Sequence, residues 1–211
     1  MKVSLNEIID ALKKAAVGTG LPVGLAEDAA QAGAWLIGQG HDGVSAVLMA
    51  IEEGFNGPAT KIEAGHTQNF FLEGRVALCG PSCVELIAGV ASVNEVCLFN
   101  VDSPFLLIGQ AGIGFQNFDI ELTLRFSDGA MASISERGLT LCGSLPQRGT
   151  DVLVTCYQSN QTTGTANIRT NDIEIEPETW HAIEALAAKT YVPSSEISRA
   201  KGAGAGPIDN N

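Results

Sequence analysis

The chain has 211 residues, of which 45% are hydrophobic and 17% are charged, a composition typical of a globular protein with an apolar core. Acidic residues outnumber basic ones by 24 to 12, which gives a formal charge of −12. This excess repels phosphate backbones and anionic lipids, so it argues against nucleic acid and membranes as partners.

The N-terminus and the cysteines indicate the compartment. Glu7 and Asp10 interrupt the first apolar stretch, which argues against a signal peptide, and no window approaches ~18 uninterrupted apolar residues. The number of cysteines is odd, and most of them sit in apolar runs: Cys79, Cys83, Cys97, Cys142 and Cys156. Buried, reduced thiols explain this pattern, and we expect a cytoplasmic protein.

The first fifty residues predict three short helices. Ser4 and Glu7 form a capping box, and the apolar residues that follow it have helical spacing up to Gly18. A second helix is expected over residues 25–37. Asp42 then caps a third helix, which ends near Gly54.

After residue 68 the pattern changes to short apolar runs that predict strands. The first spans residues 69–78, and Pro81 is expected to open a helix that ends near Ser92. Ser127-Asp128-Gly129 is expected to form a hairpin turn. Further strands are expected at residues 95–101, 105–108, 118–126, 130–135, 139–142, 152–157 and 173–176.

The end of the chain adds a last helix and a polar tail. Pro177 opens the helix, with Trp180 among its inward-facing residues. The order of elements predicts an α+β fold, with a mixed, mostly antiparallel sheet and two helices after the N-terminal helices. We expect a helical subdomain over residues 1–57 and a sheet subdomain with a glycine-rich tail over residues 58–211.

The glycine-rich stretch Gly109-Gln110-Ala111-Gly112-Ile113-Gly114 could suggest a dinucleotide site. Such a site requires a helix directly after the glycines, whereas residues 118–126 alternate as a strand. The stretch is therefore interpreted as a turn between strands. No cofactor and no metal site are predicted.

Cys79 and Cys83 lack the second ligand pair that a zinc site requires. Cys83 falls in the first turn of the helix predicted after Pro81, where the helix dipole would lower the pKa of a thiol. A reactive Cys83 is one reading, and ordinary packing of a small residue is the other.

His41 and Asp42 lie where one predicted helix ends and the next begins. An imidazole at such a junction can carry protons, and both residues are candidates for catalysis. The alternative is structural: Asp42 caps a helix, and His41 is a surface residue.

The tail combines Ser195, Glu196 and Arg199 with a glycine-alanine repeat over residues 202–206. Glycines let backbone N–H groups converge on an anion, and Arg199 could clamp a carboxylate. The tail is therefore a candidate substrate-binding segment. A flexible tail, or one that covers a neighbouring molecule, is the alternative.

Several short motifs, among them Gly20-Leu21-Pro22, Ala26-Glu27 and Gly40-His41-Asp42, follow one another in the order seen at the start of the type 2 malate/L-lactate dehydrogenases. The resemblance to that family covers about fifty residues and implies a helical subdomain. The catalytic histidine of the family follows this motif, where the present chain has Gly43-Val44-Ser45. His41 matches the first, non-catalytic histidine, or the catalytic one if two residues are deleted. The whole chain resembles an uncharacterised bacterial family of about 200 residues.

These observations lead to two functional hypotheses. The first is a protein that binds a small carboxylate, such as an amino-acid or hydroxy-acid derivative, between His41, Asp42 and Arg199, either as an enzyme of bacterial catabolism or as an accessory to one. The second is a non-catalytic interaction subunit that docks through its tail. A homodimer is expected in either case.

Overall fold

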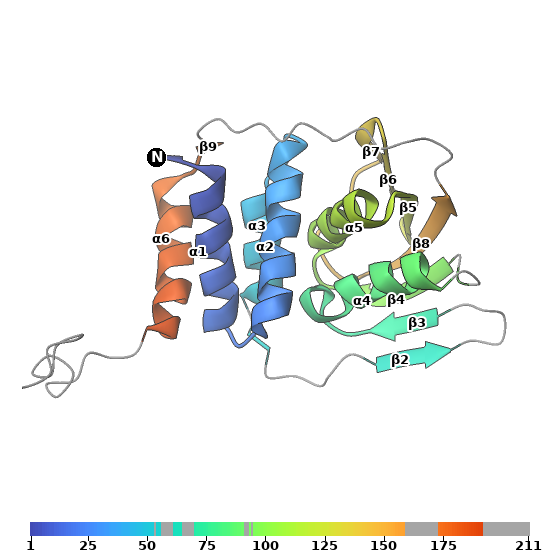
Figure 1. Ribbon diagram of the computed structural model, residues 1–211, viewed down its shortest axis with the longest axis horizontal. Helices are drawn as coiled ribbons and strands as arrows, with labels where there is room; N and C mark the ends of the chain where they lie inside the picture. Colours follow the sequence, from blue (N-terminus) through green and yellow to red (C-terminus); the bar gives the residue numbers. More distant parts are fainter. Residues whose placement is uncertain are drawn as a thin grey trace, which may run out of the picture.

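The computed structural model describes residues 1–52, 54–55, 61–64, 70–90, 93, 95–158 and 173–191. Its class is α+β, as predicted: helices come first along the chain, and a mostly antiparallel sheet follows. Figure 1 shows α1, α2, α3 and α6 gathered at one end, with α4 and α5 beside the sheet at the other.

The helices are α1 (Leu5–Gly18), α2 (Val23–Gly38), α3 (Gly43–Ile51), α4 (Val76–Gly89), α5 (Pro104–Phe118) and α6 (Pro177–Ala187), with a 3-10 turn at Ala188–Thr190. The strands are β1 (Lys2–Val3), β2 (Lys61–Ala64), β3 (Phe70–Glu73), β4 (Glu95–Val101), β5 (Ile120–Phe126), β6 (Met131–Ser135), β7 (Gly138–Cys142), β8 (Thr150–Gln158) and β9 (Ile173–Glu174).

The larger sheet has the strand order β2-β3-β4-β8-β5-β6-β7. Its pairs are antiparallel except β3 with β4, which is parallel. On β5, Ile120, Leu122 and Leu124 are buried, whereas Thr123 and Arg125 alternate onto the other face. This alternation is the one expected of a strand with one covered face.

The first three helices confirm their sequence signals. The capping box at Ser4 is formed in full, and the Asp42 side chain caps α3. The helix α2 begins at Val23, two residues earlier than expected. Local capping chemistry therefore sets where α1 and α3 begin.

The glycine-rich stretch is not a turn, and residues 105–108 are not a strand; both predictions are wrong, because these residues belong to α5. A Cβ at Gly109 would lie 2.6 Å from the carbonyl oxygen of Ala32, and one at Gly112 would lie 2.3 Å from the Trp35 ring. The glycines therefore let α5 approach α2 closely. Tertiary packing overrides the low helix propensity of glycine here.

The expected start of the fourth helix at Pro81 is also wrong. The helix α4 begins at Val76 and holds Pro81 in its interior, so the preceding strand β3 ends at Glu73. Asp102 explains the early start, because its Oδ1 accepts a hydrogen bond of 2.9 Å from the Val76 N–H. A cap that comes from a distant part of the chain leaves no local signal.

The two ends of the described chain lie together. The strands β1 and β9 form a small antiparallel sheet, in which Val3 is opposite Ile173. The helix α6 packs on α1, and Figure 1 shows the two side by side. Within the described ranges, no helix combines the length and apolar character that a membrane crossing requires.

Candidate functional site

A pocket of about 260 Å³ lies beside His41. One wall is the junction between α2 and α3, and the other is the segment that runs from β9 into α6. Its lining residues are Ile37, His41, Asp42, Val44, Ser45, Ile173, Glu174, Ile175, Glu176 and Thr179. Two segments far apart in the sequence, residues 37–45 and 173–179, thus build one concave site.

The backbone of the α2–α3 junction fixes His41. Gly40 adopts a φ of +84°, which L side chains rarely take, and the His41 N–H donates to the Leu36 oxygen at 3.0 Å. The imidazole is half-buried and tilted against the Phe105 ring, with ring centroids 6.0 Å apart. The backbone of the junction and the Phe105 ring therefore hold the His41 imidazole at the pocket in a defined orientation.

The carboxylate of Asp42 is engaged by Ser45. Its Oδ1 accepts the Ser45 N–H at 2.9 Å, and its Oδ2 accepts the Ser45 hydroxyl at 2.6 Å. Asp42 is thus the cap of α3, and its oxygens are directed at Ser45 rather than at His41. Its negative charge nevertheless contributes to the pocket lining.

The opposite wall adds two more carboxylates, Glu174 and Glu176. No side chain caps the start of α6, where Pro177 is the first residue and Thr179 lines the pocket. The positive ends of the α3 and α6 dipoles border the same space. The pocket therefore offers carboxylates for a cationic group, and an imidazole and two helix N-termini for an anionic one.

The predicted substrate-binding residues Ser195, Glu196 and Arg199 lie outside the described residues. Among the described residues, the segment that faces His41 is 173–179 instead. The Ile-Glu alternation of this segment was recognised as a strand, but no local pattern indicates that it lies opposite His41. The sequence alone therefore does not identify Glu174 and Glu176 as pocket residues.

Cys83 does not lie at a helix N-terminus, because α4 begins at Val76. Its side chain is fully buried, and burial raises the pKa of its thiol. Burial likewise raises the pKa of Cys79 to about 12. Both effects oppose a reactive thiolate and favour the packing interpretation.

The described residues contain no group of three or more His, Cys, Asp or Glu side chains that could hold a metal ion. The five cysteines are free thiols, and Cys142 is the one that is exposed. The pocket beside His41 is therefore the candidate site, and the roles of His41 and Asp42 in it stay predictions.

The comparisons with known proteins give a family match over part of the chain and a similar fold. A family described as a protein of unknown function, DUF3726, matches residues 3–83, which include His41 and Asp42. No curated protein matches the chain. The solved structure of sulfolactate dehydrogenase from Methanocaldococcus jannaschii has a similar fold, with a TM-score of 0.59 and 10% identity over 90% of this chain and 97% of that one.

A malate dehydrogenase from Entamoeba histolytica has a TM-score of 0.44 and 10% identity over 71% of this chain and 48% of that one. The likeness of the sulfolactate dehydrogenase covers far more than the fifty residues on which the sequence resemblance rested. The chain therefore shares the fold of that solved structure over most of its length. At 10% identity, this likeness concerns the fold alone.

Proposed function

We propose that this chain binds a small amino-acid derivative in the pocket beside His41. The observation that carries the proposal is the composition of the lining: one imidazole, from His41, together with the carboxylates of Asp42, Glu174 and Glu176. A zwitterion presents groups of both signs over a few ångströms, and it matches such a lining better than a simple acid does.

The charge of the lining argues against a simple carboxylate ligand. Three negative side chains would repel an anion, and His41 is the one basic residue of the described lining. An ammonium group reverses this effect, because it can pair with Glu174 or Glu176. The ligand's own carboxylate can then be held by His41 and by the uncapped start of α6.

Binding, rather than turnover, is the role that the geometry supports. The oxygens of Asp42 accept hydrogen bonds from Ser45, and among the described residues no hydrogen bond joins Asp42 to the His41 imidazole, as the orienting carboxylate of a catalytic pair would. The volume of about 260 Å³ is at the lower end for small-molecule sites, which favours a ligand the size of an amino acid.

Thermal-shift measurements test the proposal. The panel holds amino acids and their derivatives, the matching hydroxy acids and the matching amines. Hydroxy acids are included because a fold neighbour is named a sulfolactate dehydrogenase. A ligand at a hundred times its Kd stabilises the folded state by about 2.7 kcal/mol, so the rise in Tm is readily measured.

His41→Gln and Glu176→Gln are each expected to abolish the shift. His181→Gln is the matched control, because His181 is exposed on α6 and lies outside the pocket lining. The proposal fails if no zwitterion raises Tm, or if His41→Gln leaves the shift unchanged. A rise in Tm with hydroxy acids alone would mean that the ligand is a hydroxy acid and not an amino acid.

Docking of a partner through the tail remains a prediction from the sequence, since residues 192–211 lie outside the described residues. The same panel separates the two hypotheses. An interaction subunit gives no ligand shift with any compound, and the His41 variants behave as wild type.

A further inference from the structure

The larger sheet has one face that the helices packed on it do not cover. The helices α4 and α5 contact the sheet on the side of Ile120, Leu122 and Leu124, which are buried. In Figure 1, both helices lie on one side of β4 and β5. The alternating residues of the strands form the opposite face, here called the outer face: Glu95 and Cys97 on β4, Leu153, Thr155 and Tyr157 on β8, Glu121, Thr123 and Arg125 on β5, and Met131 and Ser133 on β6.

The strand β8 carries a protruding side chain, Tyr157, here called the knob, and a hollow around Leu153 on the outer face. Tyr157 on β8 is 54% exposed, although its side chain is large and mostly apolar. A hollow of about 310 Å³ opens around Leu153, also on β8, with Cys97 and Arg125 in its lining. Thr155 lies midway between the knob and the hollow, two residues from each.

Two opposite charges are arranged in the same way on the neighbouring strand. Glu121 and Arg125 of β5 share the outer face and flank Thr123. The register pairs Glu121 with Tyr157, Thr123 with Thr155, and Arg125 with Leu153. Glu121 therefore lies beside Tyr157, and Arg125 lies beside Leu153 in a hollow whose lining also includes Asp151.

We propose that the outer face is the interface between two copies of this chain, related by a two-fold axis that runs across the strands at the level of Thr123 and Thr155. Such an axis places β8 on β8 and β5 on β5 with reversed direction. Tyr157 of each copy then enters the hollow at Leu153 of the other. The same operation places Glu121 of each copy opposite Arg125 of the other.

Three physical properties of the face support this arrangement. Face-to-face sheets pack about 10 Å apart, so side chains of the size of tyrosine interdigitate between them. A two-fold interface must be self-complementary. The knob with the hollow and the two Glu121–Arg125 contacts meet that condition around one axis, whereas Glu95, which pairs with Thr155 at the level of the axis, is brought opposite its own copy. A tyrosine is also a frequent anchor of protein interfaces, and its ring would lie beside the Arg125 guanidinium.

The oligomeric state over a series of protein concentrations, measured by sedimentation velocity, tests the proposal. The wild-type chain is expected to sediment as a dimer that dissociates on dilution. Tyr157→Ala removes the knob and is expected to weaken the dimer by about tenfold or more. Tyr191→Ala is the matched control, because Tyr191 is 64% exposed and lies beyond α6, away from the sheet.

A charge swap tests the register. Arg125→Glu and Glu121→Arg each create two like-charge contacts across the axis, and each is expected to weaken the dimer roughly tenfold. The double variant restores opposite charges and is expected to recover the dimer. The melting temperature of each variant shows that it folds, so that a loss of dimer is not a loss of fold.

A wild-type chain that stays monomeric at every concentration overturns the proposal. So does a dimer that Tyr157→Ala leaves unchanged, because another surface then forms it. A double variant that stays as weak as the single ones also overturns it, since the two charges then do not face each other. None of these results depends on ligand binding at His41.

Discussion

At the scale of single residues, Arg75 joins three elements of the fold. Its Nε donates to Asp102 Oδ2 at 2.6 Å, and its other nitrogens donate to the backbone oxygens of Ala50 and Gly54. Its guanidinium carbon lies 4.9 Å from the centre of the Phe55 ring. Since Asp102 also caps α4, this one ion pair connects the end of α3, the start of α4 and the end of β4.

We expect Arg75→Ala to lower the free energy of unfolding by about 2 kcal/mol, because it leaves Asp102 and two backbone oxygens without their donor. Urea denaturation measures the change. Lys13→Ala is the control, since the Lys13–Glu27 pair is more exposed and should contribute below about 1 kcal/mol. Equal losses in the two variants would contradict the role given to Arg75.

The cysteines give a second test at this scale. We expect Cys142 to react first with a thiol reagent in the folded protein, because it is exposed. Cys79 and Cys83 should stay unlabelled, since burial raises the pKa of both thiols and removes them from solvent. Mass spectrometry of the labelled peptides gives the order, and full labelling in denaturant is the control. Early labelling of Cys83 would revive its interpretation as a reactive thiol.

At the scale of elements, α5 occupies the centre of the molecule. It packs on α2, α3 and α4 as well as on β5 and β6. Most of its residues are buried, including Gly109, Gly112 and Gly114, and Gly114 faces Val84 of α4. A helix surrounded on all sides needs small residues wherever a neighbour comes close, and glycines serve that purpose here.

We expect Gly112→Ala to destabilise the fold by about 1–3 kcal/mol, because its Cβ would lie 2.3 Å from the Trp35 ring. Gly24→Ala is the matched control on α2, since nothing lies within 4 Å of the added Cβ. It should stabilise by up to about 1 kcal/mol through helix propensity. Urea denaturation of the pair measures both, and a harmless Gly112→Ala would mean that the α2–α5 contact is looser than described.

The helix α5 also shows which features of the fold a single sequence does not predict. Capping residues predicted α1 and α3, and Pro177 predicted α6. The alternation of apolar and polar residues predicted the strand β5. Each of these signals is local in the sequence. The glycines of α5 and the interior Pro81 of α4 reflect contacts with distant residues. A single sequence does not indicate which residues those are.

The residues of the candidate site likewise fall into those that a local sequence pattern predicts and those that it does not. His41 and the cap Asp42 were found because a helix junction has a recognisable sequence. Glu174 and Glu176 were not, since only the pairing of β1 with β9 and the packing of α6 on α1 bring them opposite His41. The tail residues that were expected there lie outside the described part of the chain.

At the scale of the whole molecule, the segment that closes the pocket is held mainly by the N-terminal end. Ile173 pairs with Val3, which is 4% exposed, and the Ile175 N–H donates to the Met1 oxygen at 2.9 Å. The helix α6 adds Ile183, which is fully buried in the core. The pocket wall therefore depends on a few contacts between the two ends of the described chain.

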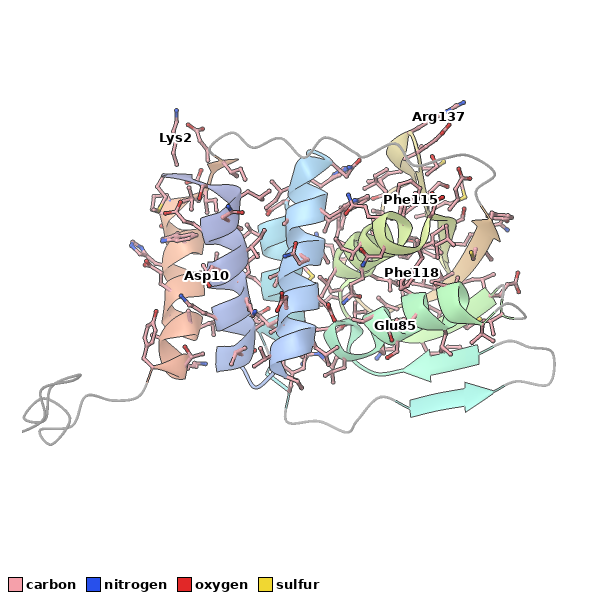
Figure 2. The ribbon with its side chains drawn as sticks, in the orientation of Figure 1. Lys2, Asp10, Glu85, Phe115, Phe118 and Arg137 are labelled. Atoms are coloured by element: carbon pink, nitrogen blue, oxygen red, sulfur yellow. The ribbon has the colours of Figure 1, made fainter. Side chains whose placement is uncertain are left out.

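We expect Val3→Asp to release this wall without unfolding the larger sheet, because a buried charge breaks the contact of β1 with β9. Hydrogen exchange should speed up over residues 173–190 and stay slow in β4 and β8. Lys2→Asp is the control, since Lys2 is exposed on the same strand and its side chain points away from the helices (Figure 2). Equal acceleration throughout the chain would show that the two ends do not open as a unit.

The pocket draws its two walls from segments far apart in the sequence, residues 37–45 and 173–179, and this has a consequence for synthesis. A growing polypeptide carries His41 early, but the segment with Glu174 and Glu176 emerges only after the whole sheet has been made. Ligand occupancy would consequently mark chains that have finished folding. A ligand present during refolding should then raise the yield of molecules in which residues 173–179 are docked opposite His41. It should not speed the earlier formation of the N-terminal helices.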